Sequence, residues 1–211
     1  MLNKKANFLT FIFSAIFIAL VIIFFCNDIY LPSKVCYPTF ILALGILTIN
    51  PRKLIFIVLA LFFSAIGDWA GSLKLFIPQI VGFAITHIFY IIFFLKKTKK
   101  RPHSYSIIAI IGAVFYGAFF IIPNVESTMQ RIAVSSYLII ITGMLYSVLQ
   151  YTGVKKAAFV IAALLFVFSD SMIAWTRFVD SVPNSSIIIM VTYYLAQYIF
   201  FLYSIETKKR T

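Results

Sequence analysis

Long apolar runs separated by short polar segments are the main pattern of this 211-residue chain. A helix needs about 20 predominantly apolar residues to cross a bilayer, and most of the runs approach that length. We therefore predict an all-α protein, a polytopic transmembrane bundle of eight helices. The predicted spans cover approximately residues 8–25, 37–48, 54–70, 75–95, 105–122, 132–151, 157–176 and 187–205.

The second span has the shortest apolar core. It approaches spanning length only when Pro38 and Asn50 are included, so a seven-span arrangement is the alternative. The basic residues favour eight spans, because 14 Lys and Arg residues then lie in segments on one side and 4 on the other. By the positive-inside rule, this split predicts that both termini are cytoplasmic. We expect a multi-pass protein of the cell membrane.

Composition excludes a soluble globular domain and disfavours a nucleic-acid partner. The chain is 63% hydrophobic and 11% charged, whereas soluble domains have about 25% charged residues. Its 18 basic and 6 acidic residues give a net charge of +12, which could indicate nucleic-acid binding. These basic residues instead lie in short clusters between apolar runs, as in membrane proteins. Since no linker or low-complexity segment divides the chain, we predict one integral membrane domain over residues 1–211.

Two carboxyl groups lie within predicted spans, those of Asp68 and Asp170. A carboxylate at the centre of a membrane helix costs at least about 2.5 to 3.5 kcal/mol, which makes both residues candidates for function. They lie 15 and 14 residues beyond Lys53 and Lys156, so both are roughly 21 to 23 Å from the cytoplasmic face. If they act on one substrate, we expect their carboxyls within about 10 Å of each other, by analogy with glycosidases. The alternative is a buried pair that only holds helices together.

Other polar side chains occupy the same predicted spans. Ser64 is one helical turn before Asp68 on the same face, and Gly67 would let another helix or a substrate approach closely. Gln197 lies near mid-membrane and needs a hydrogen-bond partner. His87 is the single His within a predicted span, and it could be a catalyst or a helix-to-helix hydrogen bond. Because a zinc site needs more ligands than this one His, we expect no metal and no cofactor.

Two cysteines flank the first predicted outer loop. Cys26 and Cys36 are ten positions apart. On the oxidising side of a membrane they could form a disulfide. Two separate thiols at helix ends are the alternative.

Three stretches carry a resemblance to a known family. The first is Ser64-Ala65-Ile66-Gly67-Asp68, followed by Phe76, Phe83, His87 and Tyr90 in the spacing F-x-x-G-x-x-x-F-x-x-x-H-x-x-Y. The second is Phe166-Val167-Phe168-Ser169-Asp170-Ser171 with Phe178 downstream, and the third is Tyr193-Tyr194-Leu195-Ala196-Gln197. At these residues the chain resembles the YhhN membrane proteins, which include the lysoplasmalogenases. Gln79 departs from the pattern, since it stands where the family usually has Gly, which bears on how that helix packs.

The resemblance implies an eight-helix hydrolase that cleaves the vinyl ether bond of lysoplasmalogens to a fatty aldehyde and a glycerophospho-head group. Its partners would be a lysophospholipid substrate and membrane lipids. Vinyl ether hydrolysis needs protonation of an alkene carbon and attack by water, which suits one carboxylic acid and one carboxylate. Two carboxyls in a site of low dielectric repel as anions, so we expect one to hold its proton near neutral pH. The catalytic candidates are Asp68 and Asp170, and the candidates for binding or orienting substrate are Ser64, His87, Tyr90, Ser169, Tyr194 and Gln197.

A small transporter that moves protons or a cation through the two intramembrane aspartates is the alternative function. Such a path should continue through polar residues to the cytoplasmic side. Residues 55–59 and 160–164, which precede the two acids, are instead entirely apolar. This pattern favours a pocket closed on the inside. A purely structural or scaffold protein is the third interpretation, and the cost of two buried acids weakens it.

Overall fold

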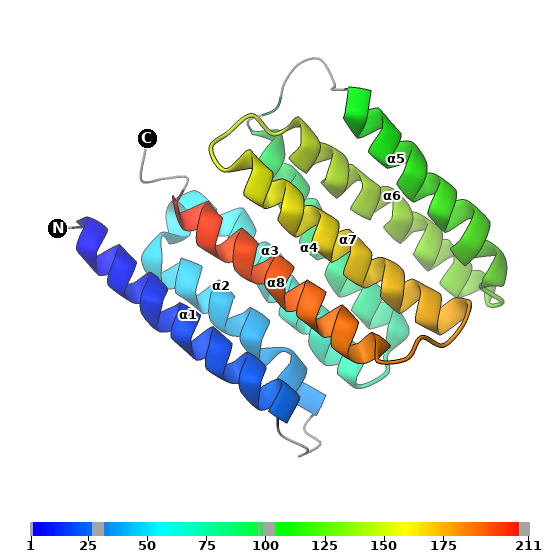
Figure 1. Ribbon diagram of the computed structural model, residues 1–211, viewed down its shortest axis with the longest axis horizontal. Helices are drawn as coiled ribbons and strands as arrows, with labels where there is room; N and C mark the ends of the chain where they lie inside the picture. Colours follow the sequence, from blue (N-terminus) through cyan, green and yellow to red (C-terminus); the bar gives the residue numbers. More distant parts are fainter. Residues whose placement is uncertain (1, 27–31, 97, 99–103, 207–211) are drawn as a thin grey trace. The chain divides into compact units, whose positions relative to one another are not determined.

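The computed structural model describes residues 2–26, 32–96, 98 and 104–206, and most of them lie in helices. Within this part the chain forms eight α-helices, which confirms the predicted helical bundle (Figure 1). The same residues contain no β-strand, and Thr98 and Tyr151 form an isolated bridge. The helices are α1 Leu2–Cys26, α2 Tyr37–Ile49, α3 Pro51–Ser72, α4 Phe76–Leu95, α5 Ser104–Tyr116, α6 Thr128–Gln150, α7 Lys156–Phe178 and α8 Ser185–Glu206.

Seven segments of the described chain are long and apolar enough to cross a membrane. The seven include α5 together with the short turns that follow it, over Ser106–Asn124. The exception is α2, whose 13 residues span about 20 Å against a hydrocarbon core of about 30 Å. That α2 crosses the membrane, and that both termini are cytoplasmic, stay predictions.

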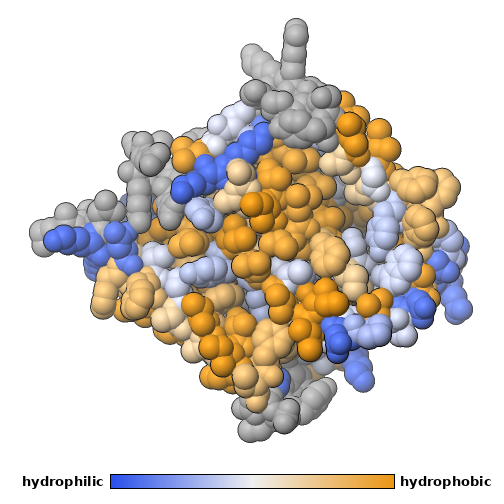
Figure 2. Space-filling view, in the orientation of Figure 1, coloured by the Kyte–Doolittle hydropathy of each residue, from blue (hydrophilic) through white to orange (hydrophobic). Residues whose placement is uncertain are grey.

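The outer surface of these helices is apolar. Figure 2 shows hydrophobic side chains over much of the visible face. Large apolar residues such as Ile108 and Ile139 are more than two-thirds exposed, at 71% and 73%. Soluble proteins rarely leave so much apolar surface in contact with water. The chain is therefore a multi-pass membrane protein.

Prolines fix several of the helix ends. Pro51 is the first residue of α3 and directly follows Asn50, which separates it from α2; proline suits this first position, where its missing N–H is not needed. After α5, the chain widens into a π-helix, η2 (Gly117–Ile121), and ends in a 3-10 turn, η3 (Ile122–Asn124). Pro123 explains why the helix stops here, because it offers no N–H to the carbonyl four residues earlier.

The helices group into two compact units, and α4 and α8 contribute to both. The first unit contains the chain up to Tyr90 and from Gln197 onward, and the second contains Ile91–Ala196. Buried side chains of α2 and α3 such as Leu42 and Leu61 form the core of the first. Met144 and Phe166 are core residues of the second. That the chain is a single domain stays a prediction.

The cysteines at the ends of the first loop are thiols. Cys26 is exposed at the end of α1, and Cys36 is partly buried immediately before α2. They are not joined by a disulfide. The structure thus has the second of the two arrangements that the sequence allowed.

Candidate active site

Asp68 lies on α3 in the first unit and is 5% exposed. The hydroxyl of Thr39, on α2, donates a hydrogen bond of 3.0 Å to its Oδ2. Thr39 itself is fully buried. The short helix α2 therefore supplies a direct partner of one of the two intramembrane carboxyls.

A chain of hydrogen bonds joins three of the predicted site residues in the same unit. The Tyr90 hydroxyl donates to Gln197 Oε1 at 2.7 Å, and Gln197 Nε2 donates to Ser64 Oγ at 2.6 Å. All three side chains are fully buried. The Tyr90 ring stacks on Phe200, with ring centroids 4.3 Å apart. Gln197 thus has the partners that its position in the membrane requires, and it links α3, α4 and α8.

His87 lies on α4, one helical turn before Tyr90, and is also fully buried. The hydroxyl of its neighbour Thr86 donates to the backbone carbonyl of Ala60 on α3 at 3.0 Å. These polar side chains therefore face the interior of the bundle, as expected for ionisable residues within membrane helices.

Glycines bring α3 and α4 into close contact beside these groups. A Cβ atom added to Gly82 would lie 2.9 Å from the Cα of Gly67, so the two helix backbones touch, as the sequence predicted for Gly67. Gln79, which departs from the family pattern, contacts α3 one helical turn beyond Gly67. A Cβ atom on Gly71 would lie 2.5 Å from Gln79 Nε2. The Gln79 side chain therefore occupies the space above Gly71, and the close approach is kept at Gly67.

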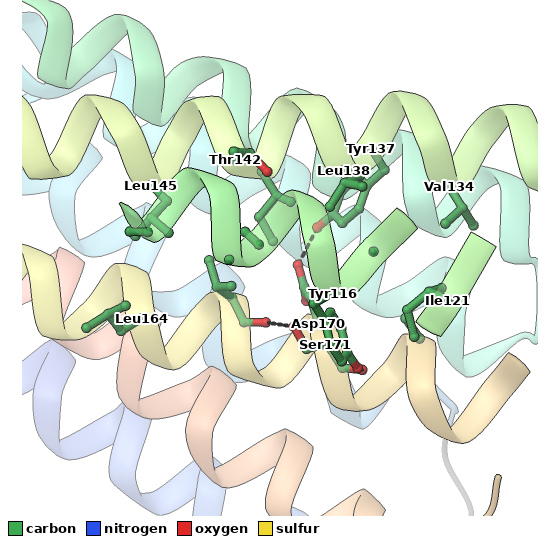
Figure 3. A pocket seen from close by; sticks show the side chains of 17 residues that line it. Tyr116, Ile121, Val134, Tyr137, Leu138, Thr142, Leu145, Leu164, Asp170 and Ser171 are labelled. Atoms are coloured by element: carbon green, nitrogen blue, oxygen red, sulfur yellow. Dashed lines mark hydrogen bonds between the residues drawn. The ribbon is translucent and has the colours of Figure 1, made fainter. Parts of the chain in front are cut away.

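Asp170 lies on α7 in the second unit and is 9% exposed. The hydroxyl of Tyr137, on α6, donates a short hydrogen bond to its Oδ2 (Figure 3). Next to Asp170, the Tyr116 hydroxyl donates to the backbone carbonyl of Ser171 at 3.1 Å.

An apolar cavity of about 360 Å³ opens beside this carboxyl. Its walls come from α5, η2, α6 and α7, all within the second unit. Its polar side chains include Asp170, Tyr137 and Thr142, and Leu145 and Leu164 lie toward one end of it (Figure 3). The Thr142 hydroxyl is buried and has no hydrogen-bond partner among the described residues. The volume is within the range of about 300 to 1,000 Å³ typical of ligand pockets.

Two other predicted residues lie in the second unit but do not line this cavity. Ser169 is buried, and its hydroxyl donates to the backbone carbonyl of Ile189 on α8 at 3.1 Å. Tyr194 is buried against the ring of Tyr193, with centroids 5.5 Å apart. The Ser169 contact joins α7 to α8.

The structure thus divides the predicted site residues between the two units. Ser64, Asp68, His87, Tyr90 and Gln197 belong to the first, whereas Ser169, Asp170 and Tyr194 belong to the second. That the two carboxyls converge on one substrate stays a prediction. No group of three or more His, Cys, Asp and Glu side chains that could hold a metal ion occurs among the described residues.

Sequence reasoning missed three polar side chains at these positions. Thr39 donates to Asp68, Tyr137 donates to Asp170, and Thr142 lines the cavity. Thr39 lies in the shortest apolar run, and Tyr137 resembles the many aromatic residues of membrane interfaces. A usable signal was that each is a polar group within a run of apolar residues, where a polar group needs a partner.

The fold and its buried carboxyls define a polytopic helical membrane protein with acidic side chains inside the bundle. The chain belongs to the YhhN family, whose model matches residues 33–203. It is similar to the lysoplasmalogenase TMEM86B of Mus musculus, at 31% identity over 142 residues, covering 65% of this chain and 58% of that protein. It is also similar to the lysoplasmalogenase TMEM86A of Bos taurus, at 32% identity over 190 residues, covering 82% of this chain and 75% of that protein. The chain therefore spans less than two-thirds of the length of TMEM86B. No solved structure matches the chain.

Proposed function

We propose that this protein is a metal-independent hydrolase of the cell membrane that cleaves the vinyl ether bond of lysoplasmalogens. The observation that supports it most directly is the Asp170 carboxyl, bonded to Tyr137 on the wall of an apolar cavity. A group that can exchange a proton there suits a substrate whose reacting bond adjoins a hydrocarbon chain. The similarity to proteins named lysoplasmalogenase supports the choice of the vinyl ether bond.

The proposed reaction needs an acid and a base. One aspartic acid protonates the outer carbon of the C=C–O group, and the double bond becomes a C=O⁺ oxocarbenium ion. Water attacks the carbon of that ion, and the second carboxylate accepts a proton from the attacking water. The resulting hemiacetal transfers its hydroxyl proton to the ether oxygen and breaks that C–O bond. The products are a fatty aldehyde and the glycerophospho alcohol, so one water is consumed for each vinyl ether. We assign these two tasks to Asp68 and Asp170.

The other predicted residues would act by position. In this proposal Ser64, Tyr90 and Gln197 form a fixed hydrogen-bonded chain that orients the polar part of the lysophospholipid or the water. His87, Ser169 and Tyr194 complete the candidate set. Their buried positions on α4, α7 and α8 suit residues that hold the site in shape as well as residues that touch substrate.

The test is hydrolysis by the purified full chain, with vinyl ether and acyl lysophospholipids incubated side by side and products identified by mass spectrometry. We expect a fatty aldehyde from the vinyl ether lipid, which an ester hydrolase would not release. Asp68→Asn and Asp170→Asn should each reduce turnover by about 10² to 10⁴, the usual cost of losing general acid or base help. The matched control is Asp180→Asn, since Asp180 is exposed outside the spans.

Two further measurements test the assignment. The double variant Asp68→Asn/Asp170→Asn should be little slower than either single variant, because residues that act as a unit are not additive. Chelators should leave the wild-type rate unchanged. Full activity in either Asn variant, or complete inhibition by a chelator, would reject this mechanism and bring the proton- or cation-coupled transporter to the front.

A further inference from the structure

The face of α5 that forms a wall of the cavity in the second unit is built of small residues, apart from Tyr116 at its end. Ala109, Gly112, Ala113 and Gly117 line the cavity. Their spacing of three, four and eight residues from Ala109 places them on one side of the helix. The turn η2, which includes Gly117, continues this wall in the wider π form, and π-bulges frequently occur at functional sites.

The absence of bulk at Gly112 does not serve helix packing. A Cβ atom added there would meet no heavy atom within 4 Å, whereas one added to Gly82 would meet the backbone of Gly67 at 2.9 Å. Small residues in membrane helices usually allow two backbones to approach closely. Gly82 follows that rule, and Gly112 instead borders open volume. The missing side chain at Gly112 therefore leaves room for the cavity and not for a neighbouring helix.

Most polar groups of the cavity lie on α6 and α7, and α5 contributes the Tyr116 hydroxyl, which donates to the Ser171 carbonyl. Tyr137 and Thr142 come from α6, and Asp170 comes from α7. Beyond Asp170, the cavity continues to Leu164 on α7 and to Leu145 on α6. Leu164 is six residues before Asp170, so this apolar half extends about 9 Å along the helix axis. In Figure 3 the two leucines lie on one side of the Tyr137–Asp170 pair and Val134 and Ile121 lie on the other.

We propose that this cavity binds the hydrocarbon chain of a single-chain lipid, with the first carbons of the chain beside Asp170 and its tail along α5 toward Ala109 and Leu164. The walls of this half are apolar, apart from the Thr142 hydroxyl. The cavity lies within helices that are long enough to span a bilayer, where hydrocarbon is the surrounding solvent. The choice of a lysophospholipid as the lipid rests on the proposed function; the assignment of the cavity to a hydrocarbon chain rests on its walls.

The experiment is photoaffinity labelling of the purified full chain with a lysophospholipid that carries a diazirine near the end of its chain. Labelled peptides are identified by mass spectrometry. We expect the label on the apolar half of the cavity, on α6 and α7 near Leu145 and Leu164. Unlabelled lysophospholipid should compete for this site, and a diacyl phospholipid at equal concentration should not. Label spread evenly over lipid-facing residues, or equal competition by the diacyl lipid, would show ordinary bilayer contact and overturn the proposal.

Two neighbouring substitutions on α5 give a matched pair. Gly112→Trp should place its ring in the cavity and remove of the order of ten carbon–carbon contacts with the chain, which corresponds to about a tenfold loss of labelling. Ile111→Trp is the control, because Ile111 is 62% exposed and does not line the cavity. Equal labelling of the two variants would contradict the proposed position of the chain. Circular dichroism and elution volume of both variants are measured alongside, and both should match the wild type.

Two more variants separate the possible occupants. Ala109→Phe should close the far end, so that a long-chain probe loses labelling and a short-chain probe keeps it. Thr142→Val should keep the labelling, because a hydrocarbon chain makes no use of the hydroxyl; a loss would indicate a polar occupant and overturn the proposal. Labelling measures binding without turnover. If the lipid labels the cavity and no aldehyde forms, the proposed function fails and the assignment of the cavity to a hydrocarbon chain stands. If aldehyde is released and the label lies elsewhere, the proposed function stands and the assignment of the cavity fails.

Discussion

The hydrogen-bonded chain through Gln197 allows a quantitative test of the first unit. Gln197→Leu removes the bond from Tyr90 at 2.7 Å and the bond to Ser64 at 2.6 Å, and it leaves two buried hydroxyls without these partners. Side-chain hydrogen bonds between membrane helices contribute about 0.6 kcal/mol on average and about 1.7 at most. Two such bonds predict a loss of about 1 to 3 kcal/mol in the free energy of unfolding.

Tyr90→Phe removes one of the two bonds and keeps the ring on Phe200. Its expected cost is about 0.6 to 1.7 kcal/mol. Gln197→Leu already removes this bond. The cost of the double variant should therefore be smaller than the sum of the two single costs by about 0.6 to 1.7 kcal/mol. The matched control is Tyr198→Phe, because Tyr198 stacks on Phe17 and is not a hydrogen-bond partner of Gln197.

The measurement is unfolding of the purified protein in mixed micelles, titrated with a denaturing detergent and followed by circular dichroism. In the control cycle, the costs of Tyr198→Phe and Gln197→Leu should be additive. If the costs of Tyr90→Phe and Gln197→Leu were equally additive, the described network would be refuted. Activity is measured on the same samples. If the network orients substrate as proposed, Tyr90→Phe should lose turnover per folded molecule in addition to stability. Unchanged turnover would restrict the network to a structural role.

Three further predictions follow from individual contacts. Thr142→Val should leave the melting temperature unchanged or raised, since its hydroxyl has no partner among the described residues, whereas Thr86→Val should lower it, because the Thr86 hydroxyl donates to the Ala60 carbonyl. Burial, and after it the negative charge of Asp68, raises the pKa of the Cys36 thiol. Thiolate is the reactive form, so Asp68→Asn should accelerate Cys36 alkylation at a fixed pH near 8, and an unchanged rate would contradict that interaction. Gly82→Leu should destabilise the fold strongly, as seen by elution volume and unfolding, because a Cβ there already meets the backbone of α3 at 2.9 Å.

Helix positions followed closely from sequence because length and proline placement fix them locally. The predicted spans at residues 37–48 and 157–176 correspond to α2 Tyr37–Ile49 and α7 Lys156–Phe178. An apolar run must satisfy its backbone hydrogen bonds within itself in a bilayer, so the run is the helix. The break between α2 and α3 is equally local, since Asn50 is followed by Pro51.

The contacts between helices were harder to predict from the sequence, because they join residues far apart in the chain. Ser64 and Gln197 are 133 positions apart, yet they share a hydrogen bond. The sequence indicated that each of these polar groups needs a partner, and the residue types alone do not select which one. Tyr137 shows the same limit. Among 12 tyrosines, nothing in its spacing distinguishes the one that donates to Asp170 from those of an aromatic belt.

The two intramembrane carboxyls share a type of partner, and that partner suits acid and base chemistry. Asp68 accepts from the Thr39 hydroxyl, and Asp170 accepts from the Tyr137 hydroxyl. A guanidinium or ammonium group can only donate, and its charge would hold a carboxyl in the ionised form. A hydroxyl donates to a carboxylate and, after a turn about its C–O bond, accepts from a protonated carboxyl. Both aspartates therefore have a partner that can remain bonded while the carboxyl gains or loses a proton, which each must do once in every proposed turnover.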